Sequence, residues 1–149
     1  MRIGGLLKKA FLLHGQNINE KLKEYDLTMS QLDVLILVSL ANEKKQLINQ
    51  RDIEKKLDLT NPTVTGLINR LEAKGLIERH ECLQDRRIKY LYVSGKANQI
   101  NDDMKRIFSQ SDTIALKGFN EDEKRELKNY LLRMIENLKK GEWQWLRDY

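Results

Sequence analysis

The chain has 149 residues, of which 40% are hydrophobic and 33% charged, and its net charge is +5. This length suits one domain, or one domain plus a helical extension, and the composition is that of a globular protein rich in charge. No apolar run approaches the ~18 residues of a membrane span, and the first residues are too interrupted by charge for a secretory signal. We therefore expect a cytoplasmic protein with no membrane partner. The single cysteine, Cys82, excludes an intrachain disulfide and a cysteine-rich zinc site.

Two helices are expected in the first third of the chain. The first spans residues 3 to about 25, where apolar residues recur mostly at spacings of three or four and form one face. The second begins at Thr28, because Thr28 and Gln31 match a capping box. This second helix is apolar on most sides, so we expect it at the centre of the fold. The apolar face of the first helix needs a partner.

The segment 49–93 predicts two short helices, a strand, an arginine-tipped turn and a second strand. Asn49 is a good N-cap for the first of these helices. The second helix spans 60–74, with Thr60 as a cap donor and a proline in its first turn. Apolar residues at helical spacing give the second helix a core face: Val64, Leu67, Ile68 and Leu71.

The opposite face of helix 60–74 is small and polar. An ordinary solvated helix more usually carries Lys and Glu there, and Gly66 costs roughly 1 kcal/mol relative to alanine. Small residues permit a close approach to another surface, and Thr, Asn and Arg side chains hydrogen-bond base edges and phosphates. The helix alone leaves open a second interpretation, an exposed helix with one unfavourable residue.

A β-hairpin is expected after Gly75, which ends the helix, and its turn lies at residues 83–88. We expect Asp85 to orient Arg87 across this tip while Arg86 points outward. A basic tip is weak evidence alone, because edge strands commonly carry charge to resist aggregation. After a helix-turn-helix, however, it offers a cation to the minor groove beside the major groove that the second helix would enter.

The C-terminal part predicts two more helices. Ser94 can cap a helix that continues to about Lys117, and Asn120 with Glu123 forms a further capping arrangement. The last helix has an apolar seam with spacings of four, three and four, which is typical of a helix with a helical partner: Leu127, Leu131, Met134 and Leu138. That partner lies in the same chain or in a second copy. The unpartnered first helix favours a dimer.

The last seven residues hold both tryptophans, Trp143 and Trp145. We expect this tail to dock on its own protomer or on the partner. Enzymatic readings find no support, since the sequence has no phosphate-binding glycine loop, no nucleophile elbow and no ligand cluster. We therefore expect no catalytic residues, no metal and no cofactor. His80 is read as an ordinary strand residue, and Cys82 is redox-active only if neighbouring arginines lower the pKa of its thiol.

From its first helix to about Lys140 the chain resembles the MarR family of bacterial winged helix-turn-helix regulators. NQRDIEKKLDLTNPTVTGLINRLEAKGLIER is similar to that family's helix-turn-helix, and DRR followed by KYLYVS is similar to its wing. The resemblance implies a mainly α fold with a small β-hairpin wing, as a single domain over 1–149. Within it, 28–93 form the DNA-binding lobe, and 1–25 and 94–149 form a helical dimerisation region.

The resemblance also implies a homodimer that binds a double-stranded DNA operator in the bacterial cytoplasm, at the nucleoid when bound. Such proteins commonly act as repressors that a small anionic or phenolic effector, or oxidation of a cysteine, releases. The positions that match recognition-helix contacts are Thr60, Asn61, Thr63, Thr65, Asn69 and Arg70. Arg87 matches the wing arginine, Asp85 matches its acidic support, and Arg86 adds a second cation at the tip.

Three positions depart from the family pattern, and all three lie in the helix-turn-helix. Gly66 stands where many members have arginine, Glu54 replaces a residue that is usually small, and Asp58 replaces the usual turn glycine. These departures, with the modest local charge, motivate an alternative function: a winged-helix protein-interaction module or anti-repressor that does not read DNA. By position, five residues suit the lining of an effector pocket and equally suit the core: Phe11, His14, Met29, Met104 and Phe108.

Overall fold

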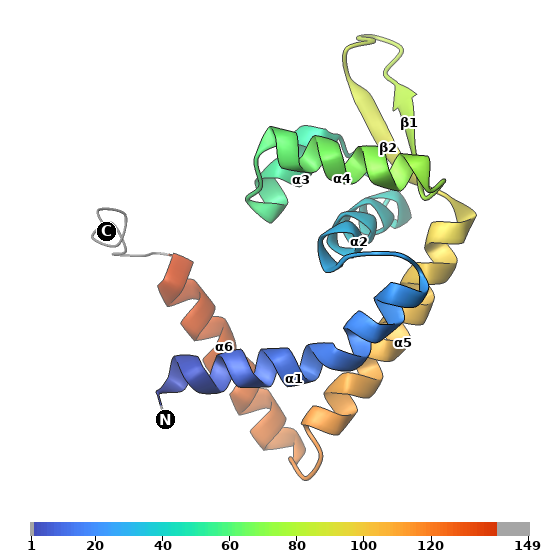
Figure 1. Ribbon diagram of the computed structural model, residues 1–149. Coiled ribbons are helices and arrows are strands. Elements are labelled where there is room, and N and C mark those ends of the chain that lie inside the picture. Colours follow the sequence, from blue (N-terminus) through green and yellow to red (C-terminus); the bar gives the residue numbers. More distant parts are fainter. Residues whose placement is uncertain (1, 140–149) are drawn as a thin grey trace. The chain divides into compact units, whose positions relative to one another are not determined.

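The computed structural model of the protein describes residues 2–139, so the tail with Trp143 and Trp145 lies outside the described residues. Over this range the chain forms six helices and one two-stranded antiparallel sheet (Figure 1). The predicted class, mainly α with a small hairpin wing, is therefore confirmed. The described residues form two compact units, one up to residue 111 and one from residue 112 onward, and each is described by itself.

The centre of the first unit is a winged helix-turn-helix lobe, and its elements follow in chain order: α2 (Met29–Glu43), α3 (Gln50–Leu57), α4 (Asn61–Ala73), β1 (Ile77–Glu81) and β2 (Lys89–Val93). Helix α2 contacts both α4 and β2, while α3 packs against α4. The two strands pair in register from Ile77 opposite Val93 to Glu81 opposite Lys89. Their connection projects away from the helices as a wing (Figure 1).

Local capping fixes where the helices of the lobe begin. Thr28 and Gln31 make the predicted reciprocal capping box at α2, with N···O distances of 3.1 and 3.2 Å. The Asn49 side chain caps α3, and the Asp52 carboxylate accepts a hydrogen bond from the Asn49 backbone N–H at 2.9 Å. These contacts satisfy N–H groups that have no partner inside the helix. Asp58 then ends α3 in the left-handed region, at φ 52°.

Helix α4 ends in a Schellman motif, and this motif directs the chain into the hairpin. The Gly75 N–H bonds the Glu72 carbonyl, and the Leu76 N–H bonds the Leu71 carbonyl, both at 2.9 Å. Gly75 has φ 69°, a conformation that glycine adopts without a steric cost. Glycine therefore suits this turn, although Asp26 and Lys45 adopt a similar positive φ at the ends of other helices.

The predicted core face of α4 is buried against α2 and the hairpin. Val64, Ile68 and Leu71 are fully buried, and Leu67 nearly so. They join one apolar cluster that also holds most of the buried face of α2 and residues of the two strands. Because these contacts fix the orientation of α4, its polar face is directed outward.

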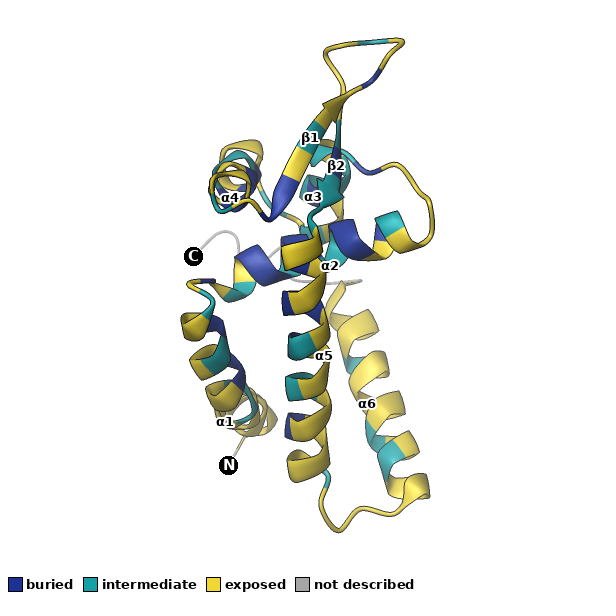
Figure 2. Ribbon diagram, turned by 90° about the vertical axis from the view of Figure 1, so that its right-hand side faces the viewer, coloured by how far each residue is buried: buried dark blue, intermediate teal, exposed yellow. Residues whose placement is uncertain are grey.

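Two longer helices adjoin the lobe, α1 (Ile3–Glu24) and α5 (Gly95–Ala115), and α5 ends in the second unit. Helix α1 joins the core only through its second half, where Ile18 and Leu22 are buried. The Tyr25 hydroxyl, just after α1, hydrogen-bonds the Asp103 carboxylate of α5. The first half of α1 is exposed (Figure 2).

The second unit contains α6 (Glu121–Lys139), which begins with the predicted capping arrangement. Asn120 and Glu123 exchange hydrogen bonds at 2.8 and 2.9 Å. No side chain of α6 is buried (Figure 2), and several large apolar ones are exposed: Tyr130, Leu131, Leu132, Ile135 and Leu138. Across residues 2–139, no helix has the length and apolar character needed to cross a membrane.

Candidate nucleic-acid interface

The outward face of α4 carries the side chains that the sequence singled out for DNA contact. Thr60, Asn61, Thr63, Asn69 and Arg70 are exposed on this helix and its N-cap. Thr65, the sixth predicted contact residue, is half-buried beside α3. All six lie on one element, so the structure brings them together on one surface.

The start of α4 differs in one detail from the sequence-based expectation. Thr60 occupies the N-cap position, but its side chain makes no capping hydrogen bond. Its Oγ1 lies 2.9 Å from Oγ1 of Thr63 instead. The expectation that Thr60 acts as a cap donor is therefore wrong. The proline in the first turn, which has no N–H to satisfy, lowers the need for a side-chain cap.

A carboxylate on α3 gathers the polar side chains at the start of α4. Oε1 of Glu54 accepts hydrogen bonds from the Gln50 amide at 3.0 Å and from the Asn61 amide at 2.8 Å. Nε2 of Gln50 also donates to Oγ1 of Thr65 at 2.8 Å. Two of the predicted contact residues, Asn61 and Thr65, are thus held from α3.

Farther along α4, the wing root holds a third predicted contact. Nη2 of Arg79, on β1, donates to Oδ1 of Asn69 at 2.7 Å. The same guanidinium pairs with the Glu72 carboxylate of α4. Because a guanidinium only donates, the Asn69 oxygen faces Arg79 and its NH₂ group faces away. Asn69 therefore presents donors at the helix surface.

Gly66 has no side chain, so the helix backbone is uncovered at the middle of this face. A Cβ placed at this position would meet only the Arg70 side chain, at an ordinary contact distance of 3.7 Å. Packing within the lobe therefore does not require glycine here. The missing side chain lets a second surface come closer to the helix axis than alanine or arginine would.

The wing tip carries the second group of predicted residues. Both Asp85 carboxylate oxygens accept from the Arg87 guanidinium, at 3.1 Å from Nε and 3.0 Å from Nη2. The Arg87 backbone N–H adds a third hydrogen bond at 3.0 Å. The expected orientation of Arg87 by Asp85 is present. Arg86 lies next to this pair, is exposed and has no ion-pair partner within residues 2–139.

The ion pair at the tip alters the titration of both partners. Hydrogen bonds from the Arg87 side chain and backbone lower the pKa of Asp85 below its ordinary value of 3.8. The bond to Asp85 likewise raises the pKa of Arg87. Both groups are charged at neutral pH, so the pair is preformed. The Arg87 side chain is 91% exposed and can reach a partner.

The remaining hairpin residues of interest have ordinary surroundings. His80 stacks on Tyr92 with ring centroids 4.6 Å apart, and its Nε2 lies 3.1 Å from the Glu78 carboxylate. Cys82 is buried, and its thiol lies 3.2 Å from the Gln84 side-chain oxygen. These contacts are those of structural side chains.

Of the five residues suggested for an effector pocket, two line one cavity. Met104 and Phe108, on α5, border a mostly apolar cavity of about 60 Å³ against α2. Asn101 lies in the same wall and is 4% exposed, and neither polar atom of its amide has a hydrogen-bond partner within the described chain. Phe11, by contrast, is 74% exposed.

The other two suggested residues lie on different elements. His14 is half-buried on α1, and Met29, at the start of α2, packs against the apolar cluster.

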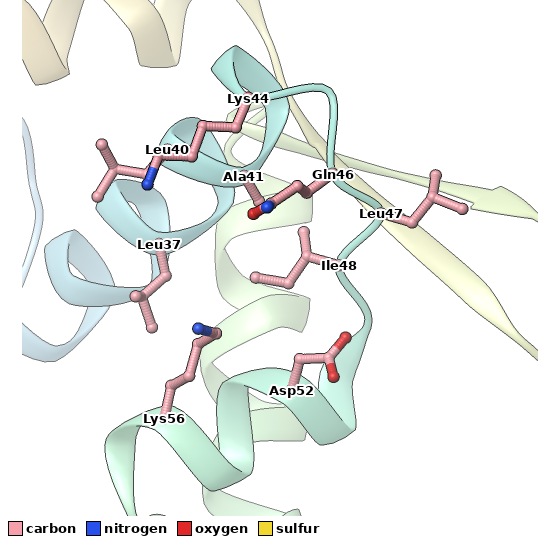
Figure 3. Close-up of a pocket in the computed structure, with 9 residues that line it drawn as sticks. All are labelled: Leu37, Leu40, Ala41, Lys44, Gln46, Leu47, Ile48, Asp52 and Lys56. Carbon is pink, nitrogen blue, oxygen red and sulfur yellow. The ribbon is translucent and has the colours of Figure 1, made fainter.

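A larger cavity of about 450 Å³ opens between the end of α2, the following loop and α3 (Figure 3). Leu37, Leu40 and Ile48 give it an apolar wall, and Lys44 from the end of α2 and Lys56 from α3 add two cations to its lining. None of its lining residues belongs to α4. It is therefore separate from the polar face described above.

Gln50 and Arg79 are the two participants that sequence reasoning missed. Each binds a predicted contact residue from a neighbouring element, across fifteen and ten positions of sequence. The i, i+4 spacing of Gln50 and Glu54 could have indicated their mutual hydrogen bond. No local pattern indicates the pairing of Arg79 with Asn69.

Comparison with known proteins finds relatives that match most of the chain. A sequence model described as the MarR family matches residues 25–88. The transcription regulator MarR from Oenococcus oeni is 30% identical over 91% of this chain and 100% of its own, with a TM-score of 0.67. The transcriptional regulator SlyA is 27% identical over 98% of this chain and 99% of its own, with a TM-score of 0.79.

A third similar structure contains DNA. It is the S. aureus MepR–DNA complex, which is 26% identical over 91% of this chain and 98% of its own, with a TM-score of 0.79. The fold and these likenesses define a winged helix-turn-helix protein of the transcription-regulator class. The chain belongs to the MarR family, which is a family of transcriptional regulators and not of enzymes.

Proposed function

We propose that the protein is a homodimeric repressor that binds a pseudo-palindromic DNA operator and leaves it when a small-molecule effector binds. The observation that carries the proposal is the face of α4: its apolar side is buried, and its opposite side is small, polar and uncovered. Such a helix fits the major groove, where base edges are distinguishable. A DNA partner would place the protein at the nucleoid in the cytoplasm.

In this proposal the two groups of predicted residues have different roles. Thr60, Asn61, Thr63, Thr65, Asn69 and Arg70 contact bases and phosphates in the major groove. Arg87 enters the adjacent minor groove with Asp85 holding it, and Arg86 meets a phosphate. Phosphate contacts supply most of the affinity, while base contacts supply specificity. The half-sites would lie one helical turn apart, roughly 34–36 Å.

The exposed apolar residues of α1 and α6 support a dimer. Within α1, Ile3 is 62% and Phe11 74% exposed, and the intervening turns expose leucines as well. Helix α6 exposes the apolar residues named above and buries none. Patches of this kind on a water-soluble regulator mark interaction sites. We assign residues 1–25 and 94–149 to the dimer interface, within one domain of the MarR type.

The cavity beside Asn101 supports the effector. A buried amide without partners costs about 1–3 kcal/mol per unsatisfied group, so a molecule that bonds it gains affinity. The surrounding Met104 and Phe108 supply apolar contact. The cavity lies between α5 and α2, and α2 supports α4. A ligand that separates α5 from α2 would therefore move the reading helices of the two protomers.

The direct test is a footprint on the DNA upstream of the protein's own gene, repeated with candidate effectors, with sedimentation to give the oligomeric state. A protected, two-fold symmetric site occupied by a dimer is expected. The alternative is a winged-helix interaction module or anti-repressor that does not read DNA. One observation favours it: Asn61 and Asn69, two amides placed to read bases, already bond side chains of the lobe. Absence of duplex binding at ~50 mM salt, where phosphate contacts are strongest, would favour that alternative.

A further inference from the structure

The carboxylate of Glu54 controls which hydrogen-bonding groups the start of α4 presents. Its Oε1 accepts from Nε2 of Gln50 and from Nδ2 of Asn61, at 3.0 and 2.8 Å. An ionised carboxylate can only accept hydrogen bonds. Both amides must therefore turn their NH₂ groups toward Glu54 and their oxygens away from it.

Gln50 is the more constrained of the two amides. Its Nε2 donates to Glu54 and also to Oγ1 of Thr65, at 2.8 Å. A primary amide has two N–H donors, so both are used. Gln50 is left with its carbonyl oxygen alone, as a pure acceptor. Thr65 accepts through its oxygen in this contact, so its hydroxyl hydrogen stays available as a donor.

An acceptor at this position discriminates between parts of DNA. Phosphate oxygens carry no hydrogen to donate, so the Gln50 oxygen cannot bond the backbone. In the major groove the donors are the exocyclic amino groups of cytosine and adenine. Without Glu54, the same glutamine could rotate its NH₂ group outward and bond any phosphate or any acceptor base edge.

We propose that Glu54 is a specificity-determining residue, which fixes Gln50 as an acceptor, turns the Asn61 oxygen outward, and so selects cytosine or adenine on the DNA strand that faces the start of α4. The proposal rests on the DNA-reading function proposed above. It gives a role to a carboxylate that would otherwise only weaken binding to an anionic partner. It also assigns the selected bases by their chemistry, as those with an amino group in the major groove.

The test compares Glu54→Ala with wild type in a selection from randomised duplexes, together with affinity for random duplex at fixed salt. Alanine suits a helix interior, so α3 should remain formed. Glu81→Ala is the matched control, because it removes one carboxylate from the same lobe. Glu81 is exposed and has no ion pair or side-chain hydrogen bond in the described part of the chain.

For Glu54→Ala we expect the preference for adenine or cytosine over guanine or thymine on that strand to fall roughly fivefold to a hundredfold, the range of one good base contact. Affinity for random duplex should stay equal or rise, since the freed amides can bond phosphate. The Glu81→Ala variant should keep the wild-type preference. An unchanged preference in Glu54→Ala, or an equal loss on every duplex, would overturn the proposal.

A second variant covers the case in which Glu54→Ala does not fold. Gln50→Ala removes the acceptor itself and should lose the same base preference, although it leaves Glu54 in place. If both variants fold, the double variant should lose little more than either one, because the two residues act as a unit. A wild-type preference in Gln50→Ala would contradict the proposal. Failure of the wild-type protein to bind any duplex would instead count against the DNA-reading function itself.

Discussion

Asp85 and Arg87, two residues apart at the wing tip, are joined by three hydrogen bonds, two from the guanidinium and one from the backbone N–H. A guanidinium has five N–H groups, so most of them stay free to bond a second partner. The pair limits the conformations of a long, exposed side chain before DNA is met. Arg87 would consequently lose less conformational entropy on binding than a free surface arginine.

Replacing Arg87 with alanine should weaken operator binding by about tenfold, within the range measured for single specific contacts. The side chain is 91% exposed and contacts no core residue, so the oligomeric state and the melting temperature should hardly change. Fluorescence anisotropy titrations at one salt concentration measure the affinity. Equal affinities for wild type and variant would show that Arg87 of the wing does not contact DNA.

Replacing Asp85 with asparagine should give a smaller loss, about threefold to tenfold, because the arginine remains but is less well held. Asparagine keeps one acceptor oxygen and loses the charge. If affinity fell as far as in the arginine variant, orientation by Asp85 would be as important as the cation itself. If it rose, the carboxylate would be acting only as a repulsive charge toward DNA.

The same ion pair has a defined pH dependence. The Asp85 pKa is lowered from 3.8 by its bonds to Arg87, so the folded state binds this proton less tightly than the unfolded chain does. The contribution of the pair is therefore present above about pH 4 and is lost as pH falls through the lowered pKa. A carbon-detected NMR titration of the Asp85 carboxyl should show a midpoint below 3.8. The Asp85 midpoint should return to its ordinary range in the Arg87→Ala variant.

The sequence predicted most of the local structure because local signals determine it. The capping box of Thr28 and Gln31, the left-handed glycine at Gly75 and the apolar spacing along α4 each act within one or two helical turns. These features gave the element order and identified the outward face of α4. The end of α5 differed slightly, at Ala115 and not near Lys117.

Contacts between elements could not be predicted in the same way. The pairing of Arg79 with Asn69 depends on the angle at which β1 leaves α4, and the Gln50 to Thr65 contact depends on how α3 packs against α4. Asn101 likewise lies on a regular helix, where the pattern does not separate a buried amide from an exposed one. Such contacts arise from the packing of one element against another. Sequence periodicity predicts which face of a helix is buried, but not which residues of a neighbouring element it meets.

Asn69 provides a test of base reading that does not disturb the lobe. Because its oxygen accepts from Arg79 at 2.7 Å, Asn69→Asp keeps that contact and removes only the outward NH₂ donors. The ratio of operator to random-duplex affinity should fall roughly fivefold to a hundredfold, with little change in melting temperature. The ratio is the informative quantity, since the added charge weakens binding to all DNA. Equal losses on operator and random duplex would exclude base reading by Asn69.

Asn101 connects stability with effector binding. Its buried amide lacks hydrogen-bond partners within the described chain, so Asn101→Leu, of similar size, should raise the free energy of unfolding by about 1–3 kcal/mol. The same variant should keep operator affinity and lose the response to any effector that bonds the amide. Urea unfolding with an unchanged m-value measures the first effect, and anisotropy with effector measures the second.

The matched control is Asn98→Leu, an exposed asparagine one turn earlier on α5, which should change stability by no more than about 0.5 kcal/mol. A gain in stability limited to position 101 would show that the Asn101 amide destabilises the fold. This result would support a role for the amide in binding an effector. Evolution removes such a group easily when it has no role, because a leucine fits the same helix face. If Asn101→Leu instead lowered stability, the wild-type amide would already have hydrogen-bond partners in solution. It would then not be available to bond an effector in the cavity.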